Sequence, residues 1–175
     1  MKLAQLEEFV RPYYDGKDVM HDLSHVKRFL RIAESLSKTY HTERQVVVLA
    51  AYFHGIDQRE CRGELTRFLR SQGMNERQQK KVLLVASESQ KDSEPRTIEG
   101  KILHDAHLVE GGRTFGVVKI LVTGILRGSS LRQIADHFEH NLDRRFKCYL
   151  PETREMYSQK EEYTRDFFRS LKGSL

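Results

Sequence analysis

The sequence predicts an all-α fold, built as one compact helical domain over residues 1–175. Three observations support this prediction. Apolar residues recur at three- and four-residue spacing in most segments, residues that cap helices precede many of these segments, and only three prolines and eleven glycines interrupt the chain. No linker or low-complexity tract divides the sequence, and its length suits a single domain with its own core.

The first two expected helices lie before residue 40. Residues 2–11 are predicted to form a short amphipathic helix, which Pro12 ends because proline cannot continue the hydrogen-bond ladder. A second helix is expected from Leu23, where Asp22 or Ser24 can accept hydrogen bonds from its free backbone N–H groups.

The third expected helix opens at Thr42 and includes the apolar run 46–53. This run is apolar on every face, which is typical of a central helix enclosed by others. Its β-branched residues leave a strand as the alternative. A helix is favoured because no other segment shows the alternation that a partner strand would need.

The same signals predict further helices, giving about ten in all. Their centres fall in the segments 65–69, 82–86, 98–106, 115–126, 131–138 and 153–171. Asn75 can cap the second of these, and Ser129 or Ser130 can cap the fifth. Thr153 is expected to begin the last helix, which is long and charged.

The charge of the chain is mildly basic. Lys and Arg total 30 against 25 Asp and Glu, a formal net charge of +5. This balance fits a phosphate-bearing ligand, although it is also ordinary for a protein surface, and the ordinary interpretation is favoured. The basic cluster 144–147 could contact nucleic acid, but four such residues among many acids usually form only a solvated helix face. Nucleic acid is therefore not expected as a partner.

Several features predict a cytoplasmic protein without membrane contact. Residues 1–8 acquire acidic side chains before any apolar stretch, so no secretory signal is expected. The isolated Cys61 and Cys148 suit a reducing compartment. The longest apolar run, 46–53, is far shorter than the roughly 20 residues of a membrane-spanning helix.

Residues suited to chemistry gather where histidines meet acidic residues, in the runs His21–His25, His54–Asp57 and His104–His107. His21 and His25 are four apart, so on one continuous helix they would share a face, as two ligands of one metal do. His25 is the better candidate because Asp22 and Ser24 both resemble capping residues, which would put His21 before the start of the helix and facing elsewhere. The isolated histidines are interpreted as surface or satisfied core residues; they are His41, His137 and His140.

Three ordered motifs resemble the HD superfamily of metal-dependent phosphohydrolases. The run 21–29, HDLSHVKRF, is similar to the family's HDxxHxxRV opening in its small bacterial and archaeal subfamily, which includes nucleotide pyrophosphohydrolases. The helix ending at His54 resembles the next element, where a His-Asp pair binds metal. Residues 95–106 are similar to the subfamily segment T-x-E-G-x-(I/V)-(L/V)-x-D-A, and residues 153–168 follow its closing helix. The resemblance covers nearly the whole chain and implies an HD-type helical domain.

The resemblance implies His25, His54 and Asp105 as ligands of a divalent metal. The fourth ligand position departs from the family, because Gly55 stands where the family has the aspartate of its His-Asp pair. Two imidazoles and a carboxylate favour a transition metal such as Mn, Fe, Co, Ni or Zn over calcium. With one carboxylate missing, the metal is expected to bind weakly or not at all.

Other polar positions depart as well. His107 and Glu110 stand where the subfamily has aspartates, and Glu88 stands where it commonly has histidine. Asp57, three residues beyond His54, could replace the missing ligand or act as general base, or could equally be a helix-end residue that faces water. Arg28 is expected to meet a substrate phosphate or to pair with an internal carboxylate, and the internal pair is favoured.

Two functions remain open. The first is a metal-dependent phosphohydrolase acting on a nucleotide or small phosphate ester. The alternative is a catalytically degenerate HD domain that serves as a nucleotide- or protein-binding regulatory module. Three surviving ligand positions favour the enzyme, with Asp57 and Arg28 as its catalytic candidates. A small phosphate-containing ligand is expected as a partner.

Overall fold

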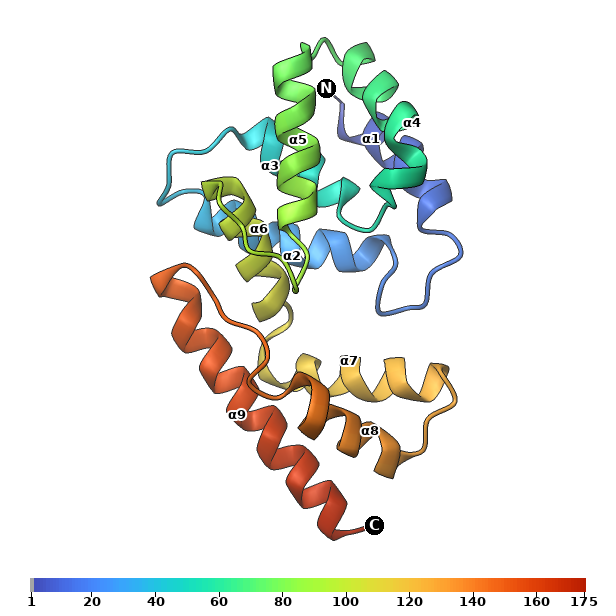
Figure 1. Ribbon diagram of the computed structural model, residues 1–175, viewed down its shortest axis with the longest axis vertical. Helices are drawn as coiled ribbons and strands as arrows, with labels where there is room; N and C mark the ends of the chain where they lie inside the picture. The colour runs from blue at the N-terminus through green and yellow to red at the C-terminus, as the bar shows by residue number, and fades with distance from the viewer. Residues whose placement is uncertain (1) are drawn as a thin grey trace.

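The structure, a computed structural model, describes residues 2–175 and is all-α, as the sequence predicts (Figure 1). Its α-helices are α1 (Leu3–Val10), α2 (Leu23–Leu36), α3 (Arg44–Phe53), α4 (Gln58–Ser71), α5 (Glu76–Glu88), α6 (Ile98–Val109), α7 (Gly112–Leu126), α8 (Leu131–His137) and α9 (Pro151–Gly173). A 3₁₀ turn, Arg11–Tyr13, follows α1, and a π-helical turn, Phe138–Leu142, follows α8. The described range contains no strand, so the strand alternative for residues 46–53 is wrong.

Capping chemistry sets most helix starts. The Asp22 carboxylate accepts two backbone N–H groups at the start of α2. Asn75 and Ser130 each form a capping box with the glutamine three residues later, which satisfies the free N–H groups at the starts of α5 and α8. α9 begins at Pro151 rather than at the expected Thr153, because proline in the first turn loses no helical hydrogen bond.

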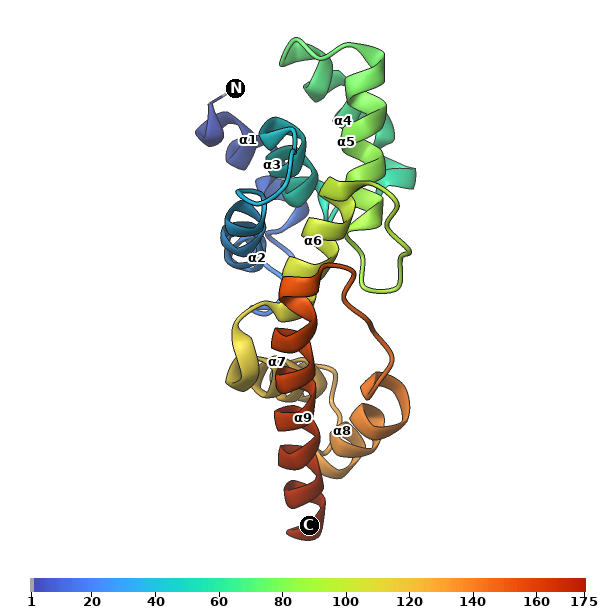
Figure 2. The same ribbon diagram turned by 90° about the vertical axis from the view of Figure 1, so that its left-hand side faces the viewer.

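The helices form two lobes, which are separated from top to bottom in Figures 1 and 2. The N-terminal lobe comprises α1 to α6, and α3 lies at its centre, with every residue from Val46 to Phe53 buried. Large apolar side chains of the surrounding helices complete this core, among them Phe29, Leu65 and Ile102. An enclosed helix must be apolar all round, which explains the unbroken run 46–53.

The C-terminal lobe comprises α7 to α9 and has a much smaller core, formed by Ile134, Ala135, Phe138 and Phe168. α9 starts beside α6 and runs along the C-terminal lobe to the far end of the molecule (Figure 2). Leu108, Val109 and Cys148 form a small buried cluster where the lobes meet. Across residues 2–175, none of the helices combines the length and the apolar character needed to cross a membrane.

Candidate metal centre and adjoining cavity

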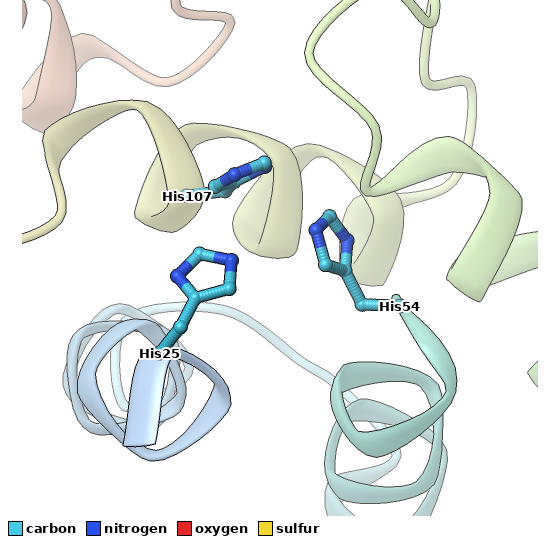
Figure 3. A group of neighbouring side chains, drawn as sticks. All are labelled: His25, His54 and His107. Atoms are coloured by element: carbon cyan, nitrogen blue, oxygen red, sulfur yellow. The ribbon is translucent and has the colours of Figure 1, made fainter. Parts of the chain in front are cut away.

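Three buried histidines from three different helices converge below the core of the N-terminal lobe. His25 lies on α2, His54 directly follows α3, and His107 lies on α6; Figure 3 shows their rings turned toward one another. One ring nitrogen of each lies within 4.8 Å of the others. Segments that are distant in the sequence therefore bring three potential ligand atoms together.

Packing holds the three rings in place. The ring of Phe29 lies 5.2 Å from that of His25, 5.1 Å from that of His54 and 5.7 Å from that of His107, measured between centroids. Phe29 is itself fully buried in the core. The histidines thus share one rigid apolar support, which is the kind of surrounding that orients metal ligands.

The Nδ1 atom of each histidine faces a protein acceptor. His25 Nδ1 lies 2.8 Å from a carboxylate oxygen of Glu110, and His107 Nδ1 lies 3.3 Å from the Ser89 carbonyl oxygen. His54 Nδ1 lies 2.7 Å from the Ser89 hydroxyl, which donates its own proton to the Ala86 carbonyl. Each Nδ1 therefore carries the proton. No hydrogen bond in the described part of the chain engages Nε2 of these rings, which leaves that lone pair available.

The electrostatic setting keeps these imidazoles neutral. Burial lowers the pKa of His54 and of His107 well below the ordinary value. Burial also lowers the pKa of His25 to about 4, even though the Glu110 carboxylate acts to raise it. A neutral imidazole is the form that binds a metal ion.

The Glu110 carboxylate is held by three basic side chains. It accepts from His25, from Arg28 Nε at 2.7 Å and from Lys119 Nζ at 3.0 Å. Burial acts to raise the pKa of Glu110, but these hydrogen bonds and charges lower it to about 2. Glu110 is therefore a charged group that orients His25 from behind.

The donor set fits a metal ion. Nitrogens bound to a tetrahedral zinc lie roughly 3.3 Å apart, so the three rings would need to approach by about 1.5 Å at most. Three imidazoles, each held through its other nitrogen and leaving a fourth position open, are the arrangement of a catalytic rather than a structural zinc site. The three buried histidines can thus form a metal site.

Asp105, an expected ligand, does not join this cluster. Its carboxylate accepts the backbone N–H groups of Tyr149 and Leu150 at 2.8 and 2.7 Å and the Thr153 hydroxyl at 2.7 Å, which ties α6 to the start of α9. Successive residues of a helix are rotated by about 100° about its axis. Asp105 and His107, which are two positions apart on α6, therefore lie on nearly opposite faces. The structure does not bring Asp105 to the other two expected ligands: His107, and not Asp105, faces His25 and His54.

The position of the missing aspartate is filled from the chain between α1 and α2. The Gly55 N–H donates to the Tyr14 hydroxyl at 3.1 Å, and the Lys17 ammonium donates to the Gly55 carbonyl. A Cβ atom on Gly55 would lie 2.6 Å from Lys17 Nζ and 2.9 Å from Tyr14 Oη. A side chain at this position would therefore have to displace both groups.

The structure does not bring Asp57, the other carboxylate considered, to the histidines. Its side chain is exposed and accepts the Arg59 N–H at 2.8 Å as the N-cap of α4, which is the helix-end alternative. Arg28 forms an internal ion pair with Glu110 and approaches the site only through that residue. Glu88 is buried and accepts the Arg96 N–H at 2.9 Å, so it holds the loop before α6.

A cavity of about 350 Å³ adjoins His107, between α6 and the C-terminal lobe. His107 and Glu110 belong to its wall, and Lys91, Lys119 and Lys160 add positive charge beside them. The lining also includes apolar side chains, namely Ile120, Ile134, Phe138, Leu142, Phe146 and Tyr157. The cavity thus combines cationic groups beside His107 and Glu110 with apolar and aromatic side chains.

The cavity lysines are partly withdrawn from water. Burial lowers the pKa of Lys91 to about 8 and that of Lys160 to about 7. Lys160 donates to the carbonyl oxygens of Leu108 and Glu110, whereas no hydrogen bond within residues 2–175 engages Lys91 Nζ. Lys91 is therefore the cation best placed to meet a ligand.

The basic cluster 144–147 lies at the edge of this cavity. Phe146 is one of the apolar lining residues, and the Arg145 guanidinium lies 5.4 Å from its ring centroid. Arg145 also pairs with Asp92 at 2.8 Å. The cluster thus joins the loop before α9 to the loop before α6.

Comparison with known proteins shows the fold. Neither a family model nor a curated protein sequence matches the chain. Bacillus subtilis YpgQ in complex with ADP shares its architecture, with 20% identity, coverage of 99% of this chain and 98% of that chain, and a TM-score of 0.77. A Lactobacillus plantarum protein has 14% identity, coverage of 98% of this chain and 95% of that chain, and a TM-score of 0.80. An HD-superfamily hydrolase from Bacillus thuringiensis has 18% identity, coverage of 99% of this chain and 98% of that chain, and a TM-score of 0.73. The chain has an HD-type helical fold.

Proposed function

We propose that the protein is a metal-dependent phosphohydrolase that acts on a nucleotide or another small phosphate ester. One observation carries the proposal: three histidines with available Nε2 atoms converge, and one of them, His107, lines a cavity that three lysines also line. A phosphate in that cavity would lie between the metal ligands and the lysines. This arrangement supports a phosphate ester whose reacting group would lie beside the candidate metal centre.

His25, His54 and His107 would hold the metal ion. When bound, such an ion polarises a phosphate oxygen and lowers the pKa of a bound water so that it can attack phosphorus. The chain itself supplies orientation and charge: Glu110 fixes the tautomer of His25, and Lys91 and Lys119 attract the phosphate oxygens. Charges act more strongly in a site that is partly withdrawn from water.

The apolar side chains of the cavity support a nucleotide as the phosphate compound. Phe138, Phe146 and Tyr157 provide aromatic surface for the body of a ligand. The YpgQ structure, which shares the fold, contains ADP. A nucleoside phosphate combines an aromatic base with anionic oxygens, which matches the aromatic and cationic side chains of this cavity.

A specific observation also favours the second function, a nucleotide-binding regulatory module. No carboxylate belongs to the set of converging ligands within the described residues, and Tyr14 and Lys17 fill the place of the missing aspartate. The metal would then bind without any compensating negative ligand. A chain in this condition could keep the nucleotide and lose the hydrolysis.

The test is hydrolysis by the full chain, purified without an affinity tag, stripped with a chelator and reloaded with one divalent metal at a time. Nucleoside mono-, di- and triphosphates serve as substrates, and released phosphate or pyrophosphate is measured. We expect metal-dependent release that is lost in His107→Ala and retained in His41→Ala, a matched change at an exposed loop histidine. If ADP binds but nothing is released with any metal, the regulatory module is correct instead.

A further inference from the structure

We propose that the metal site selects zinc over manganese and magnesium, because its ligands are three neutral imidazoles without a carboxylate. This inference rests on the metal site of the proposed function and specifies its metal. Imidazole nitrogens suit zinc and its neighbours, whereas manganese and magnesium depend on carboxylate and other oxygen ligands. The ligand set of this chain therefore decides which metal it keeps.

The nearby carboxylates are all committed elsewhere. Asp105 accepts hydrogen bonds from the start of α9, and Glu88 accepts them from the loop before α6. Glu110 is the closest acid to the histidines, but both of its oxygens are engaged by Arg28, His25 and Lys119. A metal that needs an oxygen anion would have to break one of these buried arrangements.

Ser89 gives the site a fixed geometry. Its hydroxyl is the acceptor for His54, and its carbonyl is the acceptor for His107, so one residue at the end of α5 orients two of the three ligands. The Ser89 hydroxyl is held in turn by Ala86. Outer partners of this kind keep Nε2 directed at the metal.

Positive charge around the site weakens the binding of every dication. Lys119 Nζ lies 3.4 Å from His25 Nδ1, and Lys17 bonds to Gly55, next to His54. Both ammonium groups disfavour any dication, and the penalty is similar for all of them because it depends on charge. An ion that nitrogen ligands bind strongly stays bound despite this penalty, whereas a weakly bound ion dissociates.

The experiment measures dissociation constants for zinc and manganese on the untagged, metal-free full chain, by competition with a chromophoric chelator. We expect zinc to bind at least about a hundredfold more tightly than manganese. Loading with cobalt should give the intense visible absorption of a four-coordinate ion. Equal affinity for zinc and manganese would overturn the inference.

Two pairs of variants tie the selectivity to these residues. His107→Asp, which adds a carboxylate, should lower the zinc-to-manganese preference by about tenfold, and His41→Asp should leave it unchanged. Ser89→Ala should weaken zinc binding by about 10- to 100-fold, whereas Ser87→Ala, which changes an exposed serine of the same helix, should have no effect. An unchanged affinity in Ser89→Ala would contradict the inference even if His107→Asp fails to fold.

The outcomes separate this inference from the proposed function. Tight, selective zinc binding without hydrolysis of any nucleotide would support the zinc site and overturn the phosphohydrolase. Hydrolysis that runs on manganese, with zinc bound no more tightly, would support the phosphohydrolase and overturn the zinc site.

Discussion

The two lobes differ in how their residues are held. The N-terminal lobe surrounds α3 with a large buried core, and all three converging histidines lie on its helices. The C-terminal lobe has a core of four buried residues and leaves Ile125 and Leu126 more than half exposed, yet it provides most of the cavity wall. Metal ligands need positions fixed to about half an ångström, whereas a flexible lysine can follow a phosphate. The difference teaches that the rigid lobe is suited to chemistry and the looser lobe to ligand recognition.

The largest expected effect is the loss of metal from a change in the rigid lobe. His54→Ala should weaken zinc binding by more than about a hundredfold. Loss of a residue that only hydrogen-bonds a metal ligand costs up to about a hundredfold, and loss of the ligand itself should cost more. Elemental analysis and chelator competition measure it, and ADP binding in metal-free protein should change little. A variant that keeps stoichiometric zinc would break the assignment of the metal to this lobe.

Core truncation should affect the lobes unequally. Leu49→Ala, at the fully buried centre of α3, should destabilise the protein by about 3–4 kcal/mol. The substitution leaves a cavity, and the tightly packed side chains around it cannot move in to fill it. Ile134→Ala should cost only about 2 kcal/mol, because Ile134 borders an existing cavity. Urea unfolding of both variants gives the comparison. Equal costs would show that the small core is as tightly packed as the large one.

The cavity lysine tests recognition without the metal. Lys91→Met removes the charge but keeps most of the side-chain length, so affinity for ADP should fall about tenfold, or about 1.4 kcal/mol, while zinc content stays unchanged. Isothermal titration calorimetry measures the change. Lys80→Met, an exposed lysine on α5, is the matched control. Loss of zinc in Lys91→Met would mean that metal binding and phosphate recognition do not rest on separate side chains.

The smallest expected effect concerns an ion pair of the C-terminal lobe. The Arg165 guanidinium, bonded to Asp143 at 2.7 Å, holds the pKa of Asp143 below its ordinary value of 3.8. Such a pair stabilises the fold fully above about pH 4, and its contribution disappears as the pH falls through the lowered pKa. Asp143→Asn should therefore destabilise the protein by about 1 kcal/mol at pH 7 and by less near pH 3.

Urea midpoints at the two pH values check this expectation. Asp166→Asn is the control, because the pair of Asp166 with Arg169 on α9 is well exposed and should contribute almost nothing. An equal loss at pH 7 and pH 3 would assign the effect of Asp143→Asn to packing rather than to charge.

The sequence by itself determined the helices and much of the site. The capping residues Asp22, Asn75 and Ser130 and the apolar run 46–53 indicate their structure through neighbours within one or two turns. His25 and His54 could be proposed from motifs. His107 was visible only as a departure from an expected aspartate, and nothing local showed that it faces the other two histidines.

Tertiary structure alone decided which face of α6 meets α2 and α3. The orientation of α6 turns Asp105 toward the start of α9 and His107 toward His25. The two side chains point in nearly opposite directions because helix residues two positions apart differ by about 200° around the axis. Tyr14 reaches Gly55 across 41 residues, and Glu110 reaches His25 across 85. Contacts over such distances depend on how whole helices pack, and the local pattern of the sequence does not carry that information.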